Sequence, residues 1–457
     1  MTIATALDAL SSLLGERLSR SKSELELHAR SESYFPPVVP DAIAYPQSLS
    51  DVQGLVKICA EHRCPMIGWG AGTSLEGHGL AVRGGVVIDF TRMNKLLELR
   101  PADMDVTVQP GVTREALNEE LRATGLFFPV DPGANATLGG MAMTRASGTT
   151  TVRYGSMRDN VLGMQVVLAD GRVIRTGTRA RKSAAGYDLT ALMLGSEGTL
   201  GLVTELTLKL HGIPEATSAG ICAFPDMHAA VSAVMETIQM GIPMARIEFV
   251  DAATARAFTA YSGMAMSEAP HLLVEFHGSD ASVAQDAERF AEIVADHGAS
   301  TFRWSAREEE RRALWALRHN GYYAILASRK GARALVTDIC VPISRLADAV
   351  EQTQADIAAS LIPGPILGHV GDGNFHAILL IDPDQPAEIE EAKRLSHRMA
   401  ERALALGGTC TGEHGIGMGK TGYMRAEHGD GWDVMGQIKT ALDPMNLMNP
   451  GKLVPAR

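Results

Sequence analysis

The sequence is poor in the residues that build disulfide frameworks and protein-bound redox centres. Its five cysteines (Cys59, Cys64, Cys222, Cys340, Cys410) are an odd number and form no C-x-x-C pair. This pattern predicts a reducing compartment and no disulfide framework. A haem-attachment C-x-x-C-H and an iron–sulfur cysteine set are also missing, which excludes those two centres.

Long apolar runs are lacking too, and none of those present is long enough to cross a bilayer. The N-terminus does not have the pattern of a signal peptide, because Asp8 and Glu16 interrupt it and no basic residue precedes Arg17. Apolar residues at helical spacing between Ile3 and Leu18 predict an amphipathic helix instead. We therefore expect a cytoplasmic protein, with contact with the inner face of a membrane left open.

Positive charge is in deficit. The net charge of −11 makes a nucleic-acid partner unfavourable. Hydrophobic residues make up 46% and charged residues 21% of the chain, as in an ordinary soluble enzyme. A chain of 457 residues is too long for one core, so two or three domains are expected.

A Rossmann-type dinucleotide fingerprint is also absent, although a glycine loop stands where one might be sought. The loop is Gly70-Ala71-Gly72-Thr73-Ser74-Leu75-Glu76-Gly77, with spacing G-x-G-x-x-x-x-G rather than G-x-G-x-x-G. It leads to a strand at 86–90 instead of a helix. Successive backbone N–H groups of such a loop can form an anion-binding nest, aided by two hydroxyl groups, and a pyrophosphate would suit it. The alternative is a plain glycine turn.

Three more glycine-rich segments follow in order, at 131–140, 146–155 and 194–205. Together with the first loop they resemble the FAD-binding domain of the vanillyl-alcohol oxidase type of flavoenzyme. The resemblance implies an α+β domain of two subdomains with FAD between them, the first loop holding the pyrophosphate. It also implies non-covalent FAD, because His78 lies beyond the first loop's hydroxyl residues. Further cofactor contacts implied by the resemblance are Pro132, Gly133, Thr137, Gly140, Ser147, Gly148, Thr151, Tyr154, Glu197, Gly198, Gly201, Val203 and Asn449.

Three segments are expected along the chain. Residues 1–213 form the FAD-binding domain, and Ile213-Pro214-Glu215 marks its end. Strands and helices alternate from 214 to 420 without dinucleotide glycines, which predicts a cap domain with helices covering an antiparallel sheet. Residues 421–457 are expected to return to the FAD domain.

The stretch from Gly368 to His376 carries two histidines around a turn signal, Asp372-Gly373. A two-residue turn there would pair 371 with 374 and 369 with 376, placing His369 and His376 opposite each other, with Cβ atoms about 5 Å apart. That spacing suits two ligands of one metal ion, and Glu413 is a candidate third ligand. Two histidines and a carboxylate leave coordination positions open, as in a catalytic site. The alternative is a glycine-rich turn whose histidines satisfy local hydrogen bonds.

Further segments extend the resemblance beyond the FAD domain. They are Trp315 with Arg318, 337–346, 369–376 and 412–417. These resemble the D-lactate dehydrogenase branch of the same superfamily, which also holds glycolate oxidase flavin subunits and D-2-hydroxyglutarate dehydrogenases. The match runs from about Tyr34 over nearly the whole chain. It implies oxidation of a D-2-hydroxy acid to the 2-oxo acid, with hydride transfer to FAD.

The chemistry of that reaction suggests a role for each residue. A divalent metal (zinc, manganese or iron(II)) held by His369, His376 and Glu413 would acidify the substrate hydroxyl. His414 is placed to take the proton as general base. Arg318 would grip the substrate carboxylate with help from Asn374, although a surface arginine is the alternative.

Two positions bear on the substrate. Val336 stands where the hydroxyglutarate branch has a lysine, and Tyr322 where it has a small hydroxyl residue. Both favour a short or aliphatic side chain, so D-lactate leads, while Lys330 keeps the larger substrate open. The electron acceptor is left open among cytochrome c, a quinone, an electron-transfer flavoprotein and oxygen, as is a homodimer. Two other hypotheses are a zinc-dependent hydrolase and a non-catalytic flavin- or metal-binding subunit.

Overall fold

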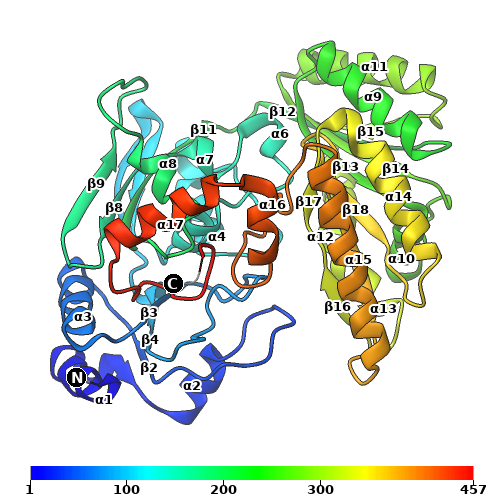
Figure 1. Ribbon diagram of the computed structural model, residues 1–457. Coiled ribbons are helices and arrows are strands. Elements are labelled where there is room, and N and C mark those ends of the chain that lie inside the picture. Colours follow the sequence, from blue (N-terminus) through cyan, green and yellow to red (C-terminus); the bar gives the residue numbers. More distant parts are fainter. Residues whose placement is uncertain (1, 456–457) are drawn as a thin grey trace. The chain divides into compact units, whose positions relative to one another are not determined.

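The computed structural model describes residues 2–455 and divides into two compact units. Unit 1 runs to Ser147, then comprises Gly155–Ile213 and the chain from Glu413 onward. Unit 2 comprises Gly148–Tyr154 and Pro214–Gly412. The chain thus changes unit at 412/413, whereas the sequence placed that boundary at 420. Figure 1 follows the chain by colour through both units.

The N-terminal part of unit 1 is a four-stranded sheet in the order β1-β2-β4-β3. Its inner strands are parallel, as strand–helix and strand–loop crossovers require. Two helices, α1 (Ile3–Leu14) and α3 (Leu49–His62), share an apolar core with this sheet. Ser48 caps the N-terminus of α3 through a hydrogen bond from the Asp51 N–H. The strands are β1 (Leu18–Ser19), β2 (Ala42–Ala44), β3 (Met66–Trp69) and β4 (Val86–Asp89), and α2 (Lys22–His28) lies between β1 and β2 in the chain.

The second part of unit 1 is a five-stranded antiparallel sheet in the order β5-β6-β10-β8-β9. Its apolar side chains form one core with the following helices and with two residues of α17. The strands are β5 (Leu96–Arg100), β6 (Asp105–Val108), β8 (Val161–Val167), β9 (Val173–Gly177) and β10 (Leu202–Lys209). The helices are α4 (Arg114–Leu121), α5 (Leu138–Thr144), α7 (Met157–Asn160), α8 (Leu189–Met193), α16 (Met424–His428) and α17 (Gly431–Leu442), and β7 (Leu126–Phe127) pairs with β11 (His211–Gly212).

Unit 2 is built on an antiparallel sheet in the order β15-β12-β14-β13-β18-β19-β16, with β17 also on β19. One face packs against α9, α11, α14 and α15, and the other against α10, α12 and α13. The strands are β12 (Ala216–Ala223), β13 (Met244–Val250), β14 (His271–Gly278), β15 (Arg303–Ser305), β16 (Arg333–Val336), β17 (Ile339–Cys340), β18 (Ile366–His369) and β19 (Asn374–Ile381). The helices are α6 (Thr151–Tyr154), α9 (Met227–Gln239), α10 (Ala252–Ser262), α11 (Asp280–Asp296), α12 (Glu308–His319), α13 (Gly321–Ala327), α14 (Leu346–Ala358) and α15 (Pro386–Ala405).

The segment from Glu308 to Ala327 forms two helices. α12 ends at His319 and α13 begins at Gly321, with Asn320 between them. An added Cβ at Gly321 would lie 3.1 Å from the Phe258 ring, so the chain needs a small residue where it passes α10. Tertiary packing thus selects the small residue at the start of α13, and helical periodicity does not report such a contact.

Candidate active site

The sheet face beneath α12 is apolar at one end and polar at the other. Along β13, Ile247 and Phe249 belong to the core on the opposite face, so Arg246 and Glu248 point toward α12. On the same face lie Leu367, Ile378 and Leu380 at the apolar end. The polar end carries the partly buried Arg246 and six buried side chains, Glu248, Glu275, His277, His369, Asn374 and His376. Polar groups gathered in this way are typical of a functional region.

The register predicted for the histidine hairpin is wrong. β18 and β19 pair His369 with Asn374, and Leu367 with His376. The connection spans 370–373, because Asp372 donates its N–H to the carbonyl of His369 and so closes a longer turn. All four paired residues still share one face, since register partners point the same way. The two imidazoles are therefore diagonal neighbours, with ring centroids 5.7 Å apart, and each offers a nitrogen within 4.8 Å of the other.

Both imidazoles are buried, and a partner holds each at Nδ1. Nδ1 of His369 lies 2.6 Å from a carboxylate oxygen of Glu248. Nδ1 of His376 lies 2.9 Å from the carbonyl oxygen of Thr337. Because both partners accept hydrogen bonds, each Nδ1 carries the proton and each Nε2 presents a lone pair. This is the tautomer that a metal ligand needs, so the pair fits a divalent ion.

Asn374 supplies an acceptor beside the histidines. Its Nδ2 donates to Asp338 Oδ1 and to the carbonyl of Ile339, both at 2.8 Å. Its Oδ1 is buried and has no hydrogen-bond partner among residues 2–455. A buried orphan acceptor costs stability unless a ligand satisfies it. An ideal Cβ on Gly412 would lie 2.1 Å from Nδ2 of Asn374, so the 412–417 loop begins directly on this amide.

Arg318 is not a surface arginine, because its side chain is largely buried and binds a carboxylate. Its Nε and Nη2 donate to Glu248 Oε2 at 2.9 and 2.6 Å, and its side chain is only 11% exposed. Glu248 itself is fully buried. Sequence reasoning missed Glu248, although its charge within the apolar run of Met244–Val250 was a usable signal. One buried carboxylate thus joins the predicted clamp to a predicted metal ligand.

In unit 1, the first glycine loop has the properties of an anion nest. Gly72 and Gly77 both have φ of +73°, which lets the chain curl. In the described chain, the N–H groups of residues 71–74 donate no hydrogen bond. An added Cβ at Gly70 would lie 2.1 Å from Thr137 Oγ1, so the loop packs against the second predicted FAD segment. The donor set fits a pyrophosphate.

The carboxylate of Glu197, implied by the resemblance as a cofactor contact, binds the backbone of another loop. It accepts the N–H groups of Ile416 and Gly417 at 2.7 and 2.8 Å. His78 Nε2 lies 3.2 Å away. Burial raises the pKa of Glu197, but His78 and the two N–H groups stabilise the carboxylate, and the net pKa is lowered.

The remaining predicted residues are distributed as follows. Ser147 Oγ donates to Glu413 Oε2 at 2.9 Å, which links a predicted cofactor residue to a predicted metal ligand. The Nδ2 of Asn449 donates to the carbonyl oxygens of His78 and Glu197. The Tyr154 hydroxyl lies 2.7 Å from His277 Nδ1 in unit 2. Gly198 lies in a turn with φ of +70°. Gly201 packs on Val166, with which Val203 pairs across β10 and β8. Gly148 starts the turn to Thr151, Gly140 is in α5, and Pro132 and Gly133 lie in the loop before α5.

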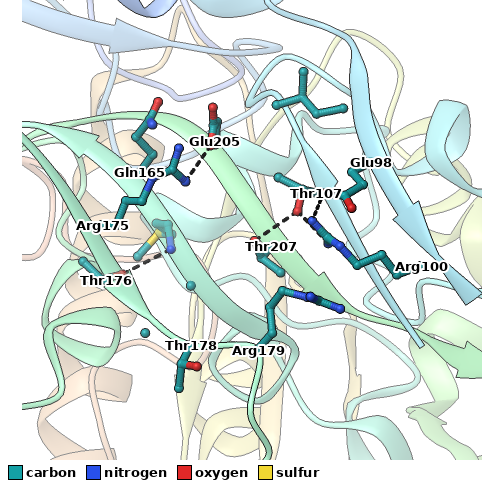
Figure 2. Close-up of a pocket in the computed structure, with 14 residues that line it drawn as sticks. Glu98, Arg100, Thr107, Gln165, Arg175, Thr176, Thr178, Arg179, Glu205 and Thr207 are labelled. Carbon is teal, nitrogen blue, oxygen red and sulfur yellow. Dashed lines mark hydrogen bonds and ion pairs between the residues drawn. The ribbon is translucent and has the colours of Figure 1, made fainter. Parts of the chain in front are cut away.

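A hollow of about 400 Å³ opens on the five-stranded sheet of unit 1 (Figure 2). Its arginines are matched by carboxylates: Arg100 lies 2.7 Å and Arg179 2.9 Å from Asp105, and Arg175 lies 2.9 Å from Glu205. Such pairing leaves little positive charge for an anion. None of the residues predicted for the cofactor, the metal or the substrate lines this hollow.

Comparison with known proteins now decides the family. Residues 40–177 match the family described as FAD binding domain, and residues 213–453 match FAD linked oxidases, C-terminal domain. The chain belongs to the FAD-linked oxidases. The resemblance deduced from its glycine loops is thereby confirmed.

Relatives of this flavoenzyme match over nearly its whole length. The probable mitochondrial D-lactate dehydrogenase of Danio rerio is 48% identical over 96% of this chain and 89% of its own. The mitochondrial D-lactate dehydrogenase [cytochrome] of Arabidopsis thaliana is 42% identical over 98% of this chain and 79% of its own. A glycolate oxidase subunit of Bacillus subtilis (strain 168) is 36% identical over 91% of this chain and 89% of its own.

The fold matches solved flavoenzymes. The structure of p-cresol methylhydroxylase with substrate bound gives a TM-score of 0.78 at 17% identity, over 98% of this chain and 96% of its own. The expected α+β architecture, a two-subdomain FAD domain with a cap domain, is confirmed.

The expected cytoplasmic location is wrong. The relatives from Danio rerio and Arabidopsis thaliana are both named as mitochondrial proteins. Among residues 2–455, no helix combines the length and apolar character needed to cross a membrane.

Proposed function

We propose that this flavoenzyme oxidises D-lactate, or a similar short D-2-hydroxy acid, to the 2-oxo acid. The observation that carries the proposal is the pair of buried histidines with fixed tautomers beside the orphan acceptor of Asn374. Two relatives that match most of the chain are named D-lactate dehydrogenase, which supports D-lactate as the substrate. Val336 and Tyr322 agree with a short side chain, since neither offers a cation to a second carboxylate.

The metal site would consist of His369, His376 and Glu413. Glu413 follows Gly412 directly, so its Cα lies about 3.8 Å from that of Gly412. Gly412 in turn rests on Asn374, which brings the third ligand within reach by covalent connection. When bound, a zinc, manganese or iron(II) ion would acidify the substrate hydroxyl, and non-covalent FAD would accept the hydride from Cα.

The chain's own residues would bind and orient the substrate. The Nη1 end of Arg318 faces no partner in the described chain and can bind the carboxylate, because Glu248 occupies the opposite edge. Asn374 Oδ1 can accept a hydrogen bond from the substrate hydroxyl. His414, next to Glu413, would take the hydroxyl proton as general base.

A cytochrome is the acceptor we favour among cytochrome c, a quinone and an electron-transfer flavoprotein, because the Arabidopsis relative is named for one. The competing substrates are glycolate, which the Bacillus relative's name supports, and D-2-hydroxyglutarate. A zinc hydrolase would leave the FAD domain without a role.

The test is anaerobic reduction of the bound flavin by a panel of D- and L-2-hydroxy acids. D-lactate should bleach the yellow protein, and L-lactate should not. Prior chelation should stop bleaching without releasing FAD, and added metal should restore it. A protein that takes up no FAD, or whose flavin ignores every D-acid, would refute the proposal; faster bleaching by glycolate or D-2-hydroxyglutarate would change the substrate.

A further inference from the structure

Glu248 is a charged residue in the middle of β13, between Ile247 and Phe249. Its side chain is 1% exposed, and a carboxylate in that position is unfavourable unless hydrogen-bonded donors surround it. The sheet offers no such donors at this position, because the backbone of β13 is paired on both sides with β14 and β18. Side chains must therefore satisfy the charge.

Two side chains do so, one on each oxygen. Oε1 lies 2.6 Å from His369 Nδ1. Oε2 accepts Nε and Nη2 of Arg318 at 2.9 and 2.6 Å. His369 lies 121 residues downstream and Arg318 lies 70 residues downstream, so only the folded sheet brings them to one carboxylate.

The two histidines are unequal in this respect. His376 donates Nδ1–H to a neutral carbonyl oxygen, whereas His369 donates to a charged carboxylate. A carboxylate partner makes the opposite ring nitrogen a better electron donor and fixes the ring plane. The same carboxylate fixes the guanidinium plane of Arg318, which leaves its Nη1 end directed away from Glu248.

We propose that Glu248 is a positioning residue that couples the metal site to the substrate-carboxylate clamp. This inference rests on the proposed function, because it needs a metal on His369 and a carboxylate on Arg318. The negative charge of Glu248 is shared between His369 and Arg318. Binding at one of these residues therefore alters the strength of the hydrogen bond between Glu248 and the other. Binding of metal and binding of 2-hydroxy acid are then linked through a single side chain.

The first test is Glu248→Gln, which keeps the size but turns one acceptor oxygen into an NH2 group. That group would face either Arg318 or His369 donor to donor, so one of the two bonds is lost. We expect zinc or manganese affinity, measured by chelator competition on the FAD-loaded protein, to fall about 10–100-fold. KM for D-lactate should rise as well, with FAD content unchanged.

Asp105→Asn is the matched control. Asp105 is a buried carboxylate, 1% exposed, on β6 in unit 1, where it lies 2.7 Å from Arg100 and 2.9 Å from Arg179, away from every predicted site residue. Its loss should lower stability but leave metal affinity within twofold. If Glu248→Gln folds, binds FAD and keeps wild-type metal affinity and KM, the inference is overturned.

The second test does not depend on Glu248→Gln folding. Arg318→Met removes the cation that binds Oε2 of Glu248, the oxygen opposite the one that faces His369. The unpaired Glu248 charge should then favour a nearby cation more strongly, so metal should bind several-fold tighter while D-lactate binds more weakly. Unchanged or weaker metal binding would contradict the coupling. If the wild-type protein itself takes up no metal or oxidises no D-2-hydroxy acid, the proposed function fails, and the two failures are thus distinguishable.

Discussion

Hydrogen bonds at one ring nitrogen decide what each histidine of the polar face can do. His369 and His376 each present Nε2 because Nδ1 is occupied. The sequence located these two side chains on one face but carried no information on their partners. Glu248 and Thr337 come from other strands or loops, and local periodicity does not record such pairings.

Replacement of His414 tests its proposed role as the general base. We expect His414→Ala to bind FAD normally and to lower the rate of flavin reduction by D-lactate about 10²–10⁴-fold, because the hydroxyl proton loses its acceptor. Anaerobic stopped-flow absorbance measures this rate. His397→Ala is the control, since that histidine is 58% exposed on α15; near-normal reduction by His414→Ala would remove the base assignment.

The connection between β18 and β19 shows how tertiary contacts set an element. Asp372-Gly373 correctly marked a turn, but the turn is longer than two residues. The reason lies outside the hairpin, where the Val341 N–H donates to the Gly373 carbonyl at 3.0 Å. A neighbouring segment therefore selects the turn and with it the register, which local turn statistics cannot foresee.

Gly373→Ala should disrupt this element. Gly373 has φ of +76°, and an added Cβ would lie 2.0 Å from the carbonyl oxygen of Val341. Gly331→Ala is a matched control, because φ there is +79° but the space is open. The control should cost about 1–2 kcal/mol of unfolding free energy from φ alone. Gly373→Ala should cost clearly more in urea titrations; equal losses would show that the close approach to Val341 is unimportant.

Within unit 1, Glu197 binds the 413–417 loop. Glu197→Gln places an NH2 group against the N–H of Ile416 or Gly417, at a cost of about 1–3 kcal/mol. Amide exchange at 416 and 417 should therefore accelerate, whereas Glu205→Gln, which disturbs only a partly exposed pair with Arg175, should leave it unchanged. Unaltered exchange in Glu197→Gln would mean that the loop is held by other contacts.

The same residue predicts a pH dependence. The pKa of Glu197 is lowered in the folded chain, so its stabilising effect is complete above its ordinary value of 4.5. That contribution is lost as pH falls through the lower folded pKa. Wild-type stability should thus decline more steeply below pH 4.5 than that of Glu197→Gln; parallel curves would argue against an ionised, loop-binding carboxylate.

For the whole molecule, the order of the glycine-rich segments predicted the FAD-binding fold, which the family matches confirm. The spacing of the first glycine loop was enough to predict a strand on each side of it. The FAD-binding fold could be predicted only because several motifs occur together. The return of the chain to unit 1 at Glu413 rather than at 421 was not foreseen. Its cause is a long-range bond, from Glu197 to a loop 219 residues later.

The net charge of the chain should affect how fast it meets a charged electron acceptor. With a basic cytochrome c as acceptor, the net charge of −11 should speed association at low salt. kcat/KM for cytochrome c should fall steeply between about 0.01 and 0.15 M ionic strength, as the Debye length shortens from about 30 to 8 Å. An uncharged dye acceptor should show no such fall. Salt-independent turnover with cytochrome c would speak against an electrostatically guided encounter.

The discontinuity of unit 1 has a consequence for how the protein is made. Unit 1 begins at the N-terminus, but its Glu197 carboxylate and the carbonyl of His78 accept hydrogen bonds from the segment after 412. All of unit 2 must leave the ribosome first. These contacts are among the most distant in the sequence, so their closure should be slow and should follow release of the chain. The loop bearing Glu413 and His414 would then be the last to settle, and nascent chains would stay inactive until translation ends.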